Sequence, residues 1–264
     1  MLHYSQQQYR IFRIIFGLYL FSHFLSLYPY SRELFADGII PDPLLNPTSK
    51  LMPFFLDDYI EWVMGGLVIA SLLFTFGIKR RSMALILWLG WAYLLNRNNL
   101  ISNPGVPYVG WLLLVNIAIE PNSDVHPRIF WVSWFFMGLG YTISGLHKLQ
   151  CPSWLDGSAL FHVLSSVLAK DNFITEFLLS KPTLLKYSTW ATLWIEILTL
   201  PLGTFDIPRK IYWIGLMIMH LGILLTINFV DLTLGVLMIH LFTFDARWLK
   251  EFPFRQIKKL IYKV

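Results

Sequence analysis

The feature that most constrains the fold of this chain is a series of long apolar segments separated by short polar turns. A helix that crosses the hydrocarbon core of a bilayer needs roughly 20 predominantly apolar residues, and several segments approach that length. Of the 264 residues, 56% are hydrophobic and 14% are charged, whereas a soluble domain carries about 25% charged residues. Mean hydropathy is +0.56. Because lipid offers no partners to backbone polar groups, the pattern predicts an all-α, polytopic integral membrane protein.

The apolar segments predict about eight spanning helices in a single transmembrane domain that covers residues 1–264. Segment 107–119 is short for a span and region 158–180 is ambiguous, so seven or nine spans also fit. No long linker or internal repeat divides the chain. The tail, residues 246–264, is basic and amphipathic, which is typical of a segment that lies on an anionic leaflet. The predicted spans are 11–28, 59–78, 82–95, 107–119, 129–149, 184–203, 209–228 and 231–244.

The placement of lysine and arginine predicts the orientation of these helices. With eight spans and the N-terminus inside, fourteen Lys and Arg fall in the inner segments and seven in the outer segments. The positive-inside rule therefore favours helices that lie in a lipid bilayer with both termini in the cytoplasm. The net charge of +5 reflects this placement, and no nucleic-acid partner is expected. The single Cys excludes an intrachain disulfide, and the oligomeric state stays open.

Ionisable side chains within the predicted spans fall in the middle and outer half of the membrane. Such groups are costly in lipid and usually mark a functional site. Two outer segments, the loop 31–57 and the amphipathic stretch 150–183, are expected to lie over this end of the bundle. We therefore predict one cavity that opens to the outer face. The ionisable group comprises His23, Arg97, Lys148, Glu196, His220 and His240.

Each of these side chains also has a purely structural explanation. Lys148 and Arg97 could extend to the outer headgroups, and each histidine could bond a carbonyl on a neighbouring helix. Glu196 at mid-depth must be protonated or paired. The small residues between 138 and 145 are expected to allow close helix contact. The zinc-protease, serine-hydrolase, Walker and Cys/His zinc motifs are absent from the sequence, so no metal site is predicted.

Two neighbouring motifs give the chain a resemblance to a known family. Residues 145–149 read Gly-Leu-His-Lys-Leu, and residues 154–157 read Trp-Leu-Asp-Gly. Together they resemble the signature of the HTTM family, the horizontally transferred transmembrane domain. That family includes the membrane domain of vitamin K-dependent gamma-glutamyl carboxylase and membrane proteins that mature a sporulation-delaying toxin. Weaker similarities lie in the segments 34–41 and 96–105 and at two late positions, His220 and Asn228.

The resemblance implies an integral membrane enzyme with a reduced, vitamin K-like quinone as its cofactor. In the carboxylase, the lysine that matches Lys148 deprotonates the hydroquinone, and oxygen then converts the quinol to an epoxide. The strong base that forms removes a proton from glutamate, and carbon dioxide adds. Under this hypothesis His220 and Glu196 polarise or position the substrate. The residues expected to bind substrate are Arg97, Asn99, His147, Trp154 and Asn228.

The chain also departs from the carboxylase. It ends 20 residues after the last predicted span, without the carboxylase's lumenal β-rich region, and His147 stands where the carboxylase has a second lysine. Glutamate carboxylation is therefore in doubt. The short bacterial members favour maturation of a small secreted peptide at the bacterial inner membrane. Two alternatives stay open: a non-enzymatic scaffold or immunity-type partner that binds a peptide on the outer face, and a small transporter.

Overall fold

The computed structural model describes residues 4–36 and 58–251, and in these ranges the fold is all-α. Two isolated β-bridges are the only extended pairings among the described residues. Eight helices of 13 residues or more correspond one to one with the predicted apolar segments. They are α1 (Gln6–Leu27), α3 (Ile60–Phe76), α4 (Arg80–Arg97), α5 (Val106–Ala118), α6 (Pro127–Lys148), α10 (Pro182–Leu202), α11 (Asp206–Thr226) and α12 (Val230–Phe242).

Length and composition separate these helices into groups. Within the described residues, three helical stretches are long and apolar enough to cross a membrane: Gln6–Phe35, Pro127–Lys148 and Asp206–Thr226. Three shorter helices, α3, α5 and α12, are also apolar. The structure therefore supports an all-α protein with membrane-compatible helices, and fewer of them meet the length criterion than the eight spans predicted from sequence.

Short helices fill the connections between the long ones. The stretch predicted to be amphipathic forms α8 (Ala159–Leu164) and α9 (Phe173–Leu179), preceded by α7 (Pro152–Leu155). The loop after α1 begins with a 3-10 turn, Tyr28–Tyr30, and α2 (Ser31–Phe35), and its remainder lies outside the described residues. The predicted basic tail begins as α13 (Arg247–Glu251), and the rest of it also lies outside them.

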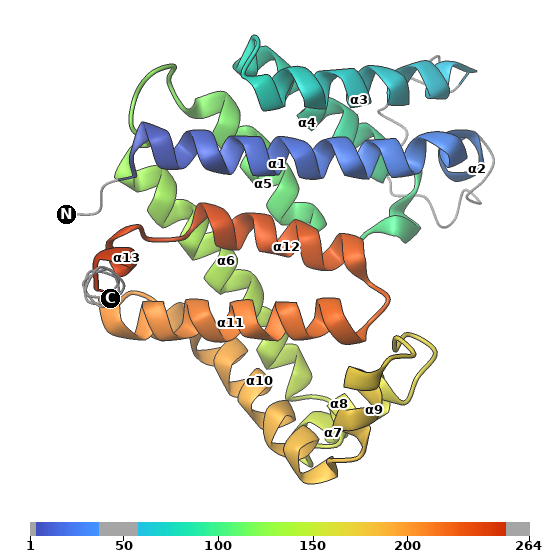
Figure 1. The fold of residues 1–264 in the computed structure, drawn as a ribbon, viewed down its shortest axis with the longest axis vertical. Coiled ribbons are helices and arrows are strands. Elements are labelled where there is room, and N and C mark those ends of the chain that lie inside the picture. Colours follow the sequence, from blue (N-terminus) through green and yellow to red (C-terminus); the bar gives the residue numbers. More distant parts are fainter. Residues whose placement is uncertain (1–3, 37–57, 252–264) are drawn as a thin grey trace, which may run out of the picture.

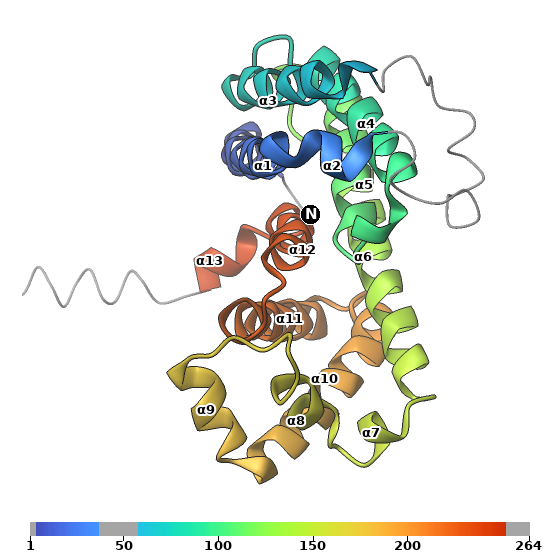
Figure 2. The same ribbon diagram turned by 90° about the vertical axis from the view of Figure 1, so that its right-hand side faces the viewer.

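The long helices pack as two groups, α1, α3, α4 and α5 in the first and α6 and α10 in the second, with α11 and α12 between them. Figure 1 shows α1, α3, α11 and α12 with nearly parallel axes, while α6 crosses them diagonally. Figure 2 looks along those four helices and shows α4, α5 and α6 arranged along one side. Helix α1 packs on α3, α4 on α5 and α6 on α10, and α12 contacts α1, α5, α6 and α11. The α6–α10 pair, with α7–α9 beside it, forms the second group.

A buried arginine holds together the end of the bundle where α11 begins. The side chain of Arg209 is fully buried, and its Nη2 lies 2.5 Å from Asp206 Oδ1 and 3.3 Å from Asp245 Oδ2. Its guanidinium also lies 4.7 Å from the ring centre of Trp131 on α6, a favourable cation–π geometry. Because a buried charge is costly unless paired, these contacts fix the position of α11 relative to α6 and the α12–α13 connection.

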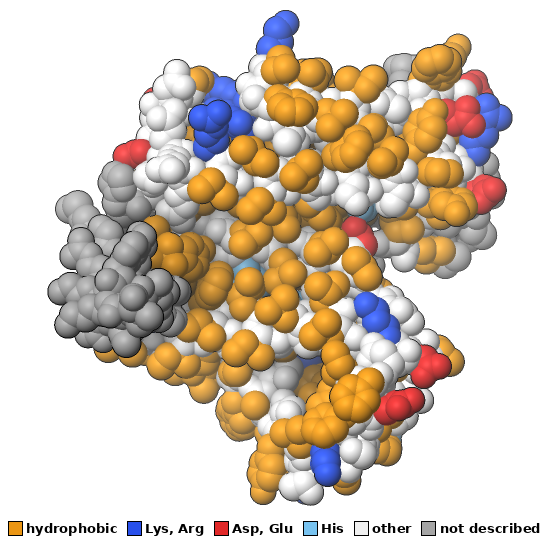
Figure 3. Space-filling view, viewed as in Figure 1, with side chains coloured by type: hydrophobic (Ala, Val, Ile, Leu, Met, Phe, Trp, Pro, Cys, Tyr) orange, Lys and Arg blue, Asp and Glu red, His pale blue; other side chains and the backbone are white. Residues whose placement is uncertain are grey.

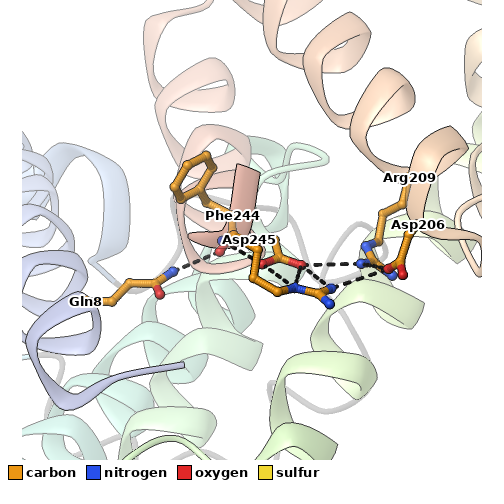
Figure 4. Close-up of polar contacts among 6 residues, drawn as sticks. Gln8, Asp206, Arg209, Phe244 and Asp245 are labelled. Atoms are coloured by element: carbon orange, nitrogen blue, oxygen red, sulfur yellow. Dashed lines mark hydrogen bonds and ion pairs between the residues drawn. The ribbon is translucent and has the colours of Figure 1, made fainter. Parts of the chain in front are cut away.

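The same cluster reaches α13 and α1. Arg247 Nη2 donates to Asp245 Oδ2 at 2.6 Å, and Gln8 Nε2 donates to the Phe244 carbonyl at 2.8 Å. Figure 4 shows Gln8 and Arg209 approaching Phe244 and Asp245 from different sides. Burial alone would raise the pKa of Asp245, but hydrogen bonds from Arg247 and the charges of Arg247 and Arg209 lower it below 3.8 overall.

The lowered pKa of Asp245 predicts an acid-sensitive contribution to stability. A carboxylate whose pKa is lower in the folded state stabilises the fold above its unfolded value and loses that contribution as pH falls through the folded value. We expect Asp245→Asn to lower the free energy of unfolding by about 1–3 kcal/mol at pH 7, as for buried charged hydrogen bonds. At pH 3 the difference from wild type should shrink. Thermal unfolding of both proteins at the two pH values measures this, and a difference that does not change with pH would contradict it.

Candidate functional site

Small residues let α6 and α10 approach at backbone distance. A Cβ atom on Gly145 would lie 2.7 Å from Ile197 Cγ1 and 2.8 Å from the Ile197 backbone nitrogen. One on Gly138 would lie 3.3 Å from the Cα of Leu200. Glycine is therefore required at position 145 for the observed contact, as the sequence predicted for this stretch. The close approach brings the last turns of α6 onto the face of α10 that carries Glu196.

A threonine on α6 compensates for a proline in α10. Pro201 lies inside α10 and has no N–H, so the carbonyl of Ile197 lacks its usual helical donor. Thr142 Oγ1 donates to that carbonyl at 3.1 Å and accepts from the Leu200 N–H at 3.2 Å. The hydroxyl thus enters the backbone ladder of α10 directly after Glu196 and anchors the two helices to each other.

Lys148, in the last turn of α6, forms an ion pair with Glu196 on α10. Lys148 Nζ also donates to Ser144 Oγ at 2.9 Å and lies 4.9 Å from the ring centre of Trp154 on α7. The Lys148 side chain is 21% exposed, whereas that of Glu196 is 6% exposed. The sequence left open whether Glu196 is protonated or paired. In the structure it is paired, and Lys148 points to its carboxylate. Lys148, Glu196 and Trp154 come together as one cluster.

A second polar cluster lies on the same face of α6, two turns before Lys148. Tyr141 Oη lies 2.6 Å from His220 Nε2 on α11 and 3.3 Å from His240 Nε2 on α12. His240 Nδ1 lies 3.0 Å from the Val236 carbonyl, so that nitrogen carries the proton and Nε2 accepts. Tyr141 then donates to His240 and accepts from His220 Nε2–H. This arrangement satisfies the tyrosine hydroxyl and both Nε2 atoms, and it leaves Nδ1 of His220 unprotonated.

The Nδ1 atom of His220 is buried and has no hydrogen-bond partner among the described residues. Buried polar atoms are rarely left in that state without a reason. With the tautomer assigned above, this atom is a lone pair that can accept a hydrogen bond or a proton. The two clusters lie two turns apart on the same face of α6, and together we call them the Lys148–His220 site.

The other predicted substrate-binding residues lie apart from this site. Arg97 Nε donates to the Phe35 carbonyl at 3.4 Å, at the end of α4, and Asn99 lies in the next turn. His147 neighbours Lys148 in sequence and is exposed. Asn228 Nδ2 donates to the Ala169 carbonyl at 3.4 Å and so joins the α11–α12 turn to the segment before α9.

The ionisable residues expected to line one cavity fall into different clusters in the described part of the chain. His23 Nδ1 lies 2.7 Å from Asp231 Oδ1, and both line a cavity of about 140 Å³ beside Trp91. Neither Lys148 nor His220 lines that cavity. No group of three His, Cys, Asp or Glu side chains in the described part of the chain is arranged to hold a metal ion.

Tyr141 is the member of the Lys148–His220 site that sequence reasoning missed. It lies within a continuous apolar run, where an aromatic residue is usually a packing residue. Its spacing of seven from Lys148 would place both on one helix face, and that spacing was the only available signal. The contact with two histidines from α11 and α12 depends on how these helices pack.

Comparison with known proteins gives no relative for this chain. No protein-family model matches it, and neither a curated protein nor a solved structure is significantly similar to it.

Proposed function

We propose that the protein is a polytopic enzyme of the HTTM type in a bacterial inner membrane, with about eight spans and both termini in the cytoplasm. The Lys148–His220 site would lie toward the outer face and use Lys148 as the base toward a lipid-soluble reduced quinone, in the modification of a small secreted peptide. The observation that supports this most directly is the Lys148–Glu196 ion pair, because it places a proton donor and acceptor together in a partly dehydrated position.

The neighbouring residues fit a quinone-type ligand. A base must be deprotonated before it can act, and Glu196 is positioned to accept the Lys148 proton. Lys148 Nζ can then take the proton of a hydroxyl group, and His220 Nδ1 offers an acceptor for a second one. The ring of Trp154 provides an aromatic surface beside the amine. A bound reduced quinone would supply the acidic hydroxyl group and the reducing electrons.

The test is oxygen-dependent consumption of a reduced naphthoquinone by the protein in lipid nanodiscs, followed by absorbance. We expect Lys148→Met and Lys148→Arg to lower the rate at least 100-fold, because a positioned base contributes roughly 10²–10⁴-fold and a guanidinium stays protonated. Lys186 is the matched control, since its ammonium also lies over a tryptophan ring, that of Trp190, at 5.0 Å. Lys186→Met should keep the wild-type rate.

Two results would overturn this proposal. If Lys148→Arg retains the wild-type rate, Lys148 is not the base. If the wild-type protein consumes no reduced quinone while remaining folded, the quinone step is excluded.

A second candidate is a scaffold that binds a peptide on the outer face without chemistry. The supporting observation is a set of exposed apolar side chains around α8 and α9, including Val167, which is 96% exposed, and Phe173, which is 78% exposed. Under this alternative, peptide binding would survive Lys148→Met unchanged but fall on Phe173→Ser. Isothermal titration with candidate secreted peptides distinguishes the two functions.

A further inference from the structure

A basic cavity lies at the end of the bundle where the beginning of α1, the α3–α4 turn and the α5–α6 loop meet. Its volume is about 550 Å³. Figure 3 shows basic side chains gathered at this end of the molecule, near the α3–α4 turn. The charged residues that line the cavity are Arg10, Arg13, Lys79, Arg80, Arg81 and Glu120.

The basic cavity is lined by five cations and one carboxylate, that of Glu120, so its net charge is positive. None of its five cations forms an ion pair with a carboxylate among residues 4–36 and 58–249. Arg13 is within electrostatic range of both Arg10 and Arg80. Helix α4 begins with Arg80 and Arg81 and has no acidic residue in its first turn, although the partial positive charge of a helix N-terminus favours anions. The cavity therefore favours a bound anion.

Two of the cations are held in place by their surroundings. Arg80 Nη1 donates to Tyr9 Oη at 2.6 Å and to the Asn116 carbonyl at 2.5 Å. The guanidinium of Arg13 packs on Gly77, where φ is 79° and an added Cβ would lie 2.7 Å from Arg13 Nη1. Arg13 Nε is buried and has no hydrogen-bond partner among the described residues. Both residues line the cavity, so it presents positive charge that is held in place by the surrounding protein.

We propose that the basic cavity binds the phosphate group of an anionic phospholipid from the cytoplasmic leaflet. Basic pockets between helices on the cytoplasmic side are suited to such headgroups. A lipid is favoured over free phosphate because Phe76, which lines the cavity, is 72% exposed and offers an apolar surface for an acyl chain. The inference rests on the membrane orientation in the proposed function but not on the chemistry of Lys148, so the quinone assay and the lipid assay fail independently.

Native mass spectrometry of the full chain released from detergent tests the site. The protein is incubated with phosphatidylglycerol, with phosphatidylcholine or with inorganic phosphate. We expect at least tenfold more bound phosphatidylglycerol than phosphatidylcholine. Arg13→Gln/Lys79→Gln should reduce phosphatidylglycerol binding at least tenfold, because each basic residue near an anionic surface contributes roughly 1 kcal/mol. Arg128→Gln/Lys181→Gln removes the same charge from exposed positions outside the cavity and should change binding less than twofold.

Three results would overturn the proposal. Equal binding of the two lipids would show that the headgroup charge is not recognised. Equal loss in the cavity and control variants would show general attraction of anionic lipid to a basic protein. Displacement of phosphatidylglycerol by millimolar inorganic phosphate would show a site for free phosphate instead of a lipid. Melting temperatures of both variants near that of wild type establish that the comparison is between folded proteins.

Discussion

Replacing Lys148 alone by methionine is expected to destabilise the protein more than replacing both Lys148 and Glu196 by methionine. The single variant leaves the Glu196 carboxylate buried without its partner, which costs about 3–5 kcal/mol in comparable buried pairs. Because Lys148 is partly exposed, we expect a loss of stability near the lower end of that range, about 3 kcal/mol. The double variant removes both charges and fills the space with apolar atoms, which is often neutral or stabilising. We therefore expect its free energy of unfolding to lie within about 1 kcal/mol of wild type.

A double-mutant cycle in detergent micelles measures this coupling. Unfolding free energies are compared for wild type, Lys148→Met, Glu196→Met and the double variant. Lys186→Met serves as a control, because an exposed cation–π contact contributes only about 0.5–1 kcal/mol. Additive single effects would show that the ion pair is not formed. The double variant also separates stability from chemistry, because under our proposal it folds but has no quinone activity.

Gly145→Ala is expected to separate α6 from α10 and to lower the free energy of unfolding by about 3 kcal/mol, near the upper end of typical overpacking costs. The added methyl group would contact the backbone nitrogen of Ile197, which cannot rotate away as a side chain can. The shift would also increase the distance between Lys148 and Glu196. We therefore expect the Lys148–Glu196 coupling energy, measured by the same cycle in the Gly145→Ala background, to decrease.

Two other helical glycines provide matched controls for this substitution. A Cβ on Gly66 or on Gly222 would meet nothing within 4 Å. At such positions alanine should stabilise the protein by about 0.4–1 kcal/mol, because it restricts the unfolded chain without strain in the folded one. Chemical unfolding of all three variants gives the comparison. A Gly145→Ala protein as stable as the two controls would show that the close α6–α10 contact does not form.

The sequence predicted the helices well because each is specified by its own residues. A continuous apolar run bounded by polar or helix-breaking residues indicates a helix whatever it packs against. For this reason the fifth predicted segment, 129–149, matches α6 (Pro127–Lys148) closely. The beginning of α1 was missed by five residues, because Ser5 caps the helix and Gln6 to Gln8 are polar. A cap of this kind is a local signal that hydropathy does not report.

The candidate site could be predicted only in part. Lys148, Glu196 and His220 stood out because an ionisable group in an apolar segment is costly and therefore conspicuous. The sequence could not show that Lys148 pairs with Glu196 rather than with a headgroup. The resemblance also grouped Arg97, Asn99, His147 and Asn228 with Lys148, but in the structure Arg97 and Asn228 contact backbone carbonyls of other segments. The pairing of side chains on different helices depends on the crossing geometry of those helices.

By itself, the sequence determined the helical class of this protein, the position of each long helix and the identity of the costly polar residues. These follow from hydropathy and charge, which act residue by residue. The tertiary structure decided which polar groups meet: Lys148 with Glu196, Tyr141 with two histidines, and five cations around one cavity. The reason is that contact between helices is set by steric fit at a few positions, such as Gly145 against Ile197, and no single segment of the chain contains both sides of that fit.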